Sequence, residues 1–117
     1  MNLDTVRSEL EQVVREADAS TATLEAEGSQ ESSELSSHDQ HPADAASDVV
    51  DHDREVALIE AAQARRAEAV EALARMDKGT YGACVDCGKP IGEARLEFRP
   101  EAARCLADQE KYEAALA

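Results

Sequence analysis

Three cysteines and one aspartate near the C-terminus have the types and spacing of metal ligands. Cys84 and Cys87 form a CxxC turn followed by a glycine, in which both sulfurs can converge on one ion. Seventeen residues lie between Cys87 and Cys105, a separation typical of structural zinc sites. Asp108 stands three residues further on, where a fourth ligand is expected, and a carboxylate can bind zinc. The sequence therefore predicts one structural zinc ion.

Three other interpretations of the cysteines stay open. The thiols could remain without a stable metal in a globule that folds by itself. A thioredoxin-like redox motif is disfavoured because no βαβ pattern surrounds Cys84 and Cys87. A thiol switch would combine weak metal binding with oxidation. A catalytic zinc is not expected, since nothing in the chain supplies pocket walls or a general base.

Two long helices are predicted to carry this site. Apolar or small residues recur alternately every three and four positions from residue 3 to residue 24, which places them on one helical seam: Leu3, Val6, Leu10, Val13, Ala17, Ser20 and Leu24. Pro42 ends this pattern and predicts a turn, with the tip of a hairpin near residues 38–48. A second helix is predicted from about Ala43 to Met76, with its own seam: Val49, Val56, Ile59, Gln63, Val70 and Leu73.

The chain changes character after the second helix. Gly79 is expected to end that helix, and glycines and a proline cluster around the cysteines as in a compact, turn-rich globule. Pro100 is expected to open a last helix from Glu101 to about Ala115. We therefore predict a mainly α fold in two domains, an antiparallel coiled-coil hairpin at 1–77 and a zinc-finger-like globule with a C-terminal helix at 78–117.

Composition supports thin helices and excludes several classes of protein. Of the 50 hydrophobic residues 23 are alanines, and the chain has no Trp and one Phe, which disfavours an aromatic-filled β-sandwich or a large enzyme with a deep pocket. Low hydrophobicity and a net charge of −14 are also the mark of disorder, the competing interpretation. Residues 1–50 carry 12 acidic and 2 basic side chains, so a partner with a basic surface is expected rather than DNA. The acidity could instead serve only to keep an exposed hairpin in solution.

The C-terminal motifs resemble the DksA/TraR zinc-finger family. The resemblance is carried by three groups of residues: Gly79-Thr80-Tyr81-Gly82-x-Cys84-x-x-Cys87-Gly88-x-x-Ile91, Arg95-Leu96, and Arg99-Pro100-x-Ala102-x-x-Cys105. It implies a transcription regulator without enzymatic activity that binds bacterial RNA polymerase directly, with the coiled coil inserted through the secondary channel. It also implies a shape similar to that of transcript-cleavage factors, frequent cooperation with the alarmone ppGpp, and no direct DNA binding.

The resemblance also assigns a role to the hairpin tip. The family carries an Asp-x-x-Asp-x-Ala motif there, close to the polymerase active site. Aligned on the proline, Asp44 takes the second Asp position and Ala46 the Ala position. His41 stands at the first Asp position, with Asp39 two residues earlier. This chain therefore departs from the family at half of the acidic pair, and at Asp108 in place of a fourth cysteine.

Two arginines are the remaining candidates for partner contact. Arg95 and Arg99 are expected to touch the polymerase or a phosphate-bearing ligand, or else to form ordinary ion pairs with Glu93, Glu97 or Glu101. No apolar run reaches the length of a membrane span and no secretory signal is present, so a cytoplasmic monomer that binds no membrane is expected. Two rival functions remain: an acidic helical adaptor for another protein, and a thiol redox-responsive protein.

Overall fold

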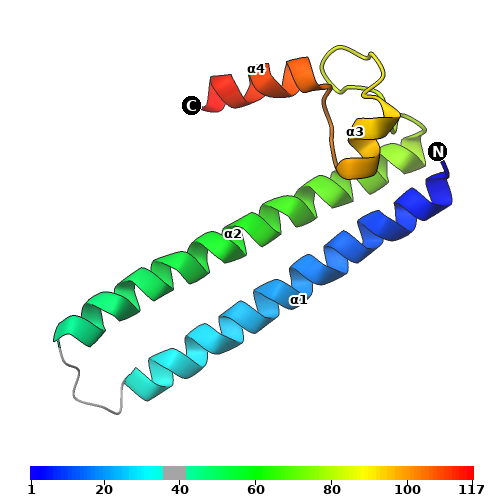
Figure 1. The fold of residues 1–117 in the computed structure, drawn as a ribbon. Helices are drawn as coiled ribbons and strands as arrows, with labels where there is room; N and C mark the ends of the chain where they lie inside the picture. Colours follow the sequence, from blue (N-terminus) through cyan, green and yellow to red (C-terminus); the bar gives the residue numbers. More distant parts are fainter. Residues whose placement is uncertain (36–41) are drawn as a thin grey trace. The chain divides into compact units, whose positions relative to one another are not determined.

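The fold of this computed structural model is mainly helical, as predicted. It describes the backbone of residues 1–35 and 42–117 and the side chains of residues 1–27 and 50–117. Four helices follow in chain order: α1 (Leu3–Leu35), α2 (Pro42–Lys78), α3 (Glu93–Phe98) and α4 (Leu106–Leu116). The helices α1 and α2 run antiparallel as the two arms of a hairpin (Figure 1).

Contacts along the chain divide it into two compact units. One unit joins Met1–Val14 to Arg65–Ala117, so it holds the open end of the hairpin together with the whole C-terminal globule. The other unit is Arg15–Ala64. The division into domains at 1–77 and 78–117 stays a prediction.

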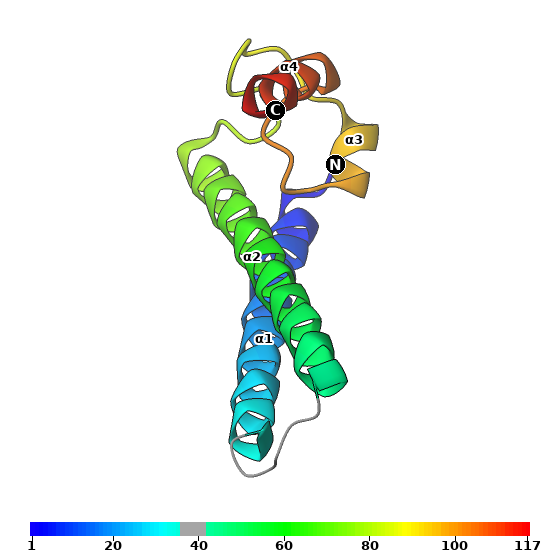
Figure 2. The ribbon, with the colours of Figure 1, turned by 90° about the vertical axis from the view of Figure 1, so that its left-hand side faces the viewer.

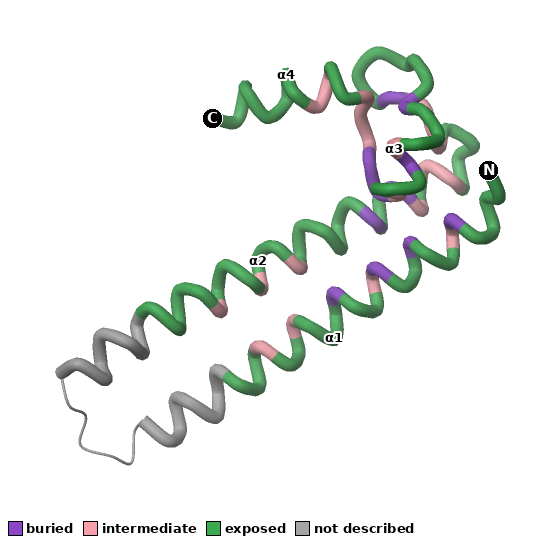
Figure 3. Tube along the Cα trace, in the orientation of Figure 1, coloured by how far each residue is buried: buried purple, intermediate pink, exposed green. Residues whose placement is uncertain are grey.

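The hairpin core of the first unit is built from larger side chains on α1 and small ones on α2. Val6, Leu10 and Val13 are buried against Ala69 and Ala72, and the buried positions of α1 recur along one side of the helix (Figure 3). Their spacing of four and three residues is that of the predicted seam. In the second unit Ala17 is also buried, which continues the same spacing.

The predicted seam of α2 is wrong in part. Val56 and Val70, both assigned to the seam, are 39% and 42% exposed, whereas Ala69 and Ala72 are fully buried. Alanines allow two helix backbones to approach closely, so the buried stripe of α2 follows its smallest residues. The larger Val70 side chain lies beside the seam rather than on it.

Local signals fix both helix ends at the open end of the hairpin. Asn2 caps α1, because its Oδ1 accepts hydrogen bonds from the backbone N–H groups of Asp4 (2.9 Å) and Thr5 (3.3 Å). Gly79 follows the last residue of α2 with a φ of 78°, as predicted for a glycine that ends a helix. The Arg7 guanidinium pairs with the Asp77 carboxylate at 2.9 Å across the two arms.

The globule has a small core of its own around the first cysteine. Cys84, Ile91, Leu96 and Ala102 are buried together, with Tyr81 packed against them. In the described part of the globule the only β-type pairing is an isolated antiparallel bridge between residues 83 and 90. Figures 1 and 2 place α3 beside the N-terminus of α1, where the Met1 amine lies 3.5 Å from the Glu93 carboxylate.

The last helix begins later than predicted. The expected helix from Glu101 is wrong, since α4 starts at Leu106 and the preceding residues are extended or turned. Tertiary contacts hold that segment: the Tyr81 hydroxyl donates to the Pro100 carbonyl at 2.9 Å, and Arg75 of α2 donates to the Ala102 carbonyl at 3.4 Å. The carbonyls of Pro100 and Ala102 therefore accept hydrogen bonds from other segments and not from the N–H groups of a helix. Ala102 is buried in the core. The short helix α3 was not predicted.

None of the helices, as far as the structure describes them, has the length and apolar character that crossing a bilayer requires.

Candidate metal centre

The first half of the site is a tight turn that carries two cysteines. The Gly88 N–H donates to the Cys84 carbonyl at 2.9 Å, and the Cys84 N–H donates to the Lys89 carbonyl at 2.8 Å. Gly88 has a φ of 74°, in the left-handed region that a side chain would strain. This turn folds the backbone around one point, so that the sulfurs of Cys84 and Cys87 can face the same centre.

The second half of the site is the beginning of α4. Cys105 is the residue before this helix and has an extended backbone conformation, and Asp108 lies in the first helical turn. The Gln109 N–H donates to the Cys105 carbonyl at 2.8 Å, which closes that turn. The predicted helix from Glu101 would have held both Cys105 and Asp108. The structure places both ligand atoms in the same cluster, although Cys105 precedes the helix.

The four candidate ligand atoms come together. All of them lie within 4.8 Å of one another. The Cys84 sulfur is 3.1 Å from Oδ2 of Asp108, and the sulfurs of Cys87 and Cys105 are 4.0 Å apart. In a tetrahedral zinc site with Zn–S bonds near 2.3 Å, two sulfurs are separated by about 3.8 Å. The donor types and separations of these residues therefore fit zinc.

Hydrogen bonds within the cluster shift the proton affinities of its members. The hydrogen bond with Asp108 raises the pKa of Cys87 to about 12, and the bond with Cys87 first, then those with Cys84 and Cys105, lower the pKa of Asp108 to about 2. Burial opposes ionisation of Cys84, but backbone N–H groups of residues 87, 105 and 86 outweigh it and lower its pKa. A metal ion that binds here must displace thiol protons, since thiolates are the ligands.

The arrangement suits a structural role for the metal. The protein supplies four ligands, so a tetrahedral ion has no open position for a substrate. An ion held by Cys84, Cys87, Cys105 and Asp108 would cross-link the CxxC turn to the start of α4. Such a link closes a loop within a globule whose core is small.

The two predicted contact arginines make intramolecular contacts. Arg95 donates from Nε to the Arg104 carbonyl at 3.1 Å. Arg99 lies 3.6 Å from the buried carboxylate of Glu101, one of the ion pairs considered from the sequence. Half of the Arg99 side chain remains exposed. Contact of either arginine with a partner stays a prediction.

Sequence reasoning missed a third arginine, Arg104, beside the site. The Arg104 guanidinium pairs with Asp86 at 2.7 Å and stacks on the Tyr112 ring, 3.8 Å from its centroid. The only signal in the sequence is that Asp86 and Arg104 adjoin cysteines, and adjacency alone does not pair them.

Of the predicted tip residues, Asp39 and His41 lie outside the described residues, and Asp44 and Ala46 are described by their backbone alone, within α2. The roles of all four stay predictions.

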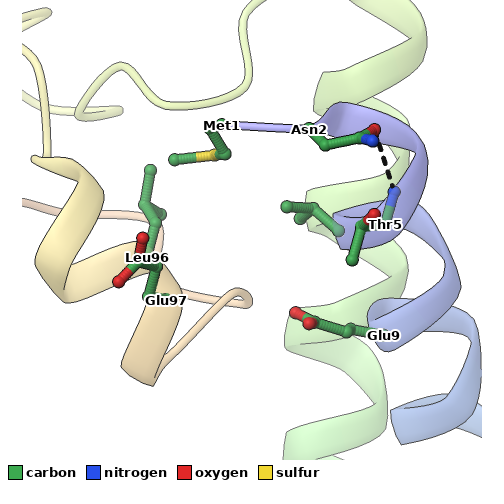
Figure 4. Close-up of a pocket in the computed structure, with 7 residues that line it drawn as sticks. Met1, Asn2, Thr5, Glu9, Leu96 and Glu97 are labelled. Carbon is green, nitrogen blue, oxygen red and sulfur yellow. Dashed lines mark hydrogen bonds between the residues drawn. The ribbon is translucent and has the colours of Figure 1, made fainter.

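A pocket of about 210 Å³ lies apart from the cysteines, between the first turns of α1 and helix α3 (Figure 4). Its walls combine apolar side chains with two carboxylates, and no basic side chain lines it: Met1, Asn2, Thr5, Val6, Glu9, Leu96 and Glu97.

Comparison with known proteins identifies the globule. Residues 79–114 match the family model described as the prokaryotic dksA/traR C4-type zinc finger. The globule therefore carries a zinc finger of the DksA/TraR type. The family resemblance expected from the sequence is thereby confirmed, and the match covers all four candidate ligands. The family description specifies four cysteines, so this chain departs from it at Asp108.

Relatives of the family resemble the chain over different lengths. The RNA polymerase-binding transcription factor DksA of Caulobacter vibrioides is 49% identical over 43 residues, 37% of this chain and 30% of that protein. The uncharacterised protein YteA of Bacillus subtilis is 35% identical over 69 residues, 59% of this chain and 29% of that protein. The chain thus aligns with less than a third of the length of these curated relatives.

A solved structure of the family resembles nearly the whole chain. Transcription factor DksA2 from Pseudomonas aeruginosa matches with a TM-score of 0.75 and 28% identity, over 96% of this chain and 83% of that one. The likeness includes both arms of the hairpin as well as the globule, and it confirms the predicted fold class.

Proposed function

We propose that this protein is a bacterial transcription regulator that binds RNA polymerase directly. The observation that carries the proposal is the likeness to transcription factor DksA2 over 96% of the chain, because it extends beyond the zinc-finger motif to the hairpin. The 49% identity to an RNA polymerase-binding transcription factor over 43 residues supports the same partner. A regulator of this kind would act by binding and without enzymatic activity.

In this proposal the hairpin is the element that enters the polymerase. The arms of residues 1–77 would reach through the secondary channel and bring the tip residues Asp39, His41, Asp44 and Ala46 near the active site. The globule of residues 78–117 would remain at the channel entrance. Arg95 and Arg99 would contact the polymerase, or a phosphate-bearing ligand such as ppGpp, after exchange of their present intramolecular partners.

Zinc would serve this function by holding the globule together. Cys84, Cys87, Cys105 and Asp108 would bind the ion, and their clustering within 4.8 Å supports this ligand set. The ion contributes a cross-link and no Lewis-acid chemistry, because all four positions are taken by the protein.

The charge of the chain limits its partners. With a net charge of −14 it repels nucleic acid phosphates, so regulation would proceed without direct DNA binding. The same charge favours the positively charged surfaces of a partner protein. We propose a monomer that acts in the cytoplasm, where its polymerase is found.

The decisive experiment is a binding titration with bacterial RNA polymerase. Labelled protein should bind the core enzyme, and a transcript-cleavage factor should displace it, because both would occupy the secondary channel. Binding without displacement would refute insertion in the channel. No binding at all would refute the proposed function and favour the adaptor, whereas reversible loss of two hydrogens in native mass spectrometry would favour the redox-responsive protein.

A pair of matched variants tests the tip. Asp44→Asn should leave polymerase binding largely intact while reducing the effect on transcription in vitro, because it changes only charge at the tip. Asp53→Asn removes the same charge from the arm of α2 and should leave both readouts unchanged. Equal transcription with wild-type protein and Asp44→Asn would contradict the assignment of Asp44.

A further inference from the structure

Three side chains outside the ligand set connect the segments that carry the metal ligands. The Nε of Arg104 donates to Oδ2 of Asp86 at 2.7 Å. The Arg104 guanidinium carbon also lies 3.8 Å from the centre of the Tyr112 ring, well within the range of a cation–π contact. One arginine therefore contacts an aspartate and a tyrosine that are 26 positions apart in the sequence.

Each of the three side chains belongs to a different ligand-bearing segment. Asp86 lies within the CxxC turn, directly before Cys87. Arg104 directly precedes Cys105, and Tyr112 lies on α4 four residues after Asp108. The contacts of Arg104 thus connect the turn, the segment before α4 and α4 itself.

Backbone contacts hold Arg104 in place for this role. The Arg104 carbonyl accepts a hydrogen bond from Nε of Arg95 at 3.1 Å, and the Val85 N–H donates to the Ala103 carbonyl at 3.0 Å. The Arg104 side chain is 21% exposed, so its ion pair with Asp86 is less screened than a fully exposed pair. A planar guanidinium can pair with a carboxylate and stack on a ring at the same time, which a lysine cannot do as well.

We propose that Asp86, Arg104 and Tyr112 form a clasp that positions the ligands of the metal site. The inference rests on the proposed zinc site and adds to it the residues that preorganise the ligands. A site with three thiolates and one carboxylate has one strong ligand fewer than a four-cysteine site. The clasp holds the CxxC turn and the start of α4 together before the metal binds. Less conformational entropy is then lost on binding, so the clasp increases the affinity for the metal without contacting the ion.

The first test measures metal affinity with cobalt(II) as a spectroscopic probe and zinc in competition with a chelator. Arg104→Ala should weaken metal affinity about 10- to 100-fold, the range found when residues that orient metal ligands are lost. The matched control is Arg7→Ala, which removes an arginine from another ion pair with an aspartate, on the hairpin. This control should keep wild-type affinity. Equal affinity of wild-type protein and Arg104→Ala would overturn the proposal.

Two tyrosine variants test the stacking contact without changing charge. Tyr112→Phe keeps the ring face and should bind cobalt(II) as tightly as wild-type protein. Tyr112→Leu keeps an apolar side chain but loses the π-face, and it should weaken binding in the same direction as Arg104→Ala. These variants also decide the matter if Arg104→Ala does not fold. Equal affinities of the two tyrosine variants would refute the stacking contact as part of the clasp.

A second readout works without metal and separates this inference from the zinc site. In the presence of chelator, the Val85 amide should exchange hydrogen faster in Arg104→Ala than in wild-type protein, because its bond to Ala103 spans the same two segments. If wild-type protein takes up no metal, the zinc site is refuted. The Val85 exchange rate then still tests whether Arg104 holds the two segments together. Unchanged exchange at Val85 would refute the clasp. Neither readout involves polymerase, so failure of the proposed partner leaves both intact.

Discussion

Leu10→Ala offers the sharpest test of the hairpin core. Leu10 has no solvent exposure, and its neighbours in the core are Val6 and Val13 on α1 and Ala69 and Ala72 on α2. Truncation of a buried leucine costs about 2–5 kcal/mol, and more where the surroundings cannot collapse into the cavity. The core here is two helices thick, so the arms can close part of the cavity. We therefore expect a loss near the lower end, about 2–3 kcal/mol.

That loss is large relative to the stability of a small protein. At about 4 °C per kcal/mol for a chain of this size, the melting temperature should fall by roughly 8–12 °C. Leu58→Ala is the matched control, because Leu58 is 45% exposed on α2 and should lose only about 1 kcal/mol. Urea and thermal unfolding followed by circular dichroism at the helix band measure both variants. If Leu10→Ala and Leu58→Ala lost equal stability, the packing of Leu10 between the arms would be wrong.

The remaining predictions concern the globule and the acidic groups beside it. Asp108→Cys should bind cobalt(II) more tightly than wild-type protein and should strengthen the thiolate charge-transfer absorption. Asp108→Ala should bind cobalt(II) more weakly. Equal spectra for all three proteins would exclude Asp108 as a ligand. Cys87→Ser, or addition of a chelator, should lower the melting temperature of the globule, and an unchanged melting curve would mean that metal does not stabilise it. Burial raises the pKa of Glu68 above its ordinary 4.5; Arg99 opposes the shift and Glu101 adds to it. The folded state therefore holds this proton more tightly than the unfolded chain, so its contribution is present below pH 4.5 and is lost as pH rises through the raised pKa. Glu68→Gln should accordingly raise the melting temperature at about pH 7 and change it little at about pH 4, and the opposite order would contradict the sign of the shift.

The sequence by itself determined the features that depend on neighbours along the chain. The three-and-four spacing specifies which side of α1 is buried from Val6 to Ala17, since helical periodicity follows from local geometry. The seam was wrong at its first residue, because Leu3 is 55% exposed. Gly79 follows the last residue of α2, as predicted. Pro42, predicted to mark the turn, is the first residue of α2, a position that suits its fixed φ. The pairing of Cys84 with Cys87 was equally local, because both lie in one short turn, whereas their approach to Cys105 and Asp108 depends on the tertiary structure.

Only the tertiary structure decided the features that depend on which segments meet. The stripe of α2 that faces α1 follows Ala69 and Ala72 rather than Val70, because the distance between two helix axes is set by both partners. The segment before α4 is not helical, since its carbonyls accept hydrogen bonds from the Tyr81 and Arg75 side chains and not from backbone N–H groups of a helix. The contacts of Arg104 likewise require a turn and a helix that are distant in sequence to be side by side. Helix propensity acts over a few residues. A segment with helix propensity adopts another conformation wherever long-range packing and hydrogen bonds stabilise that conformation more.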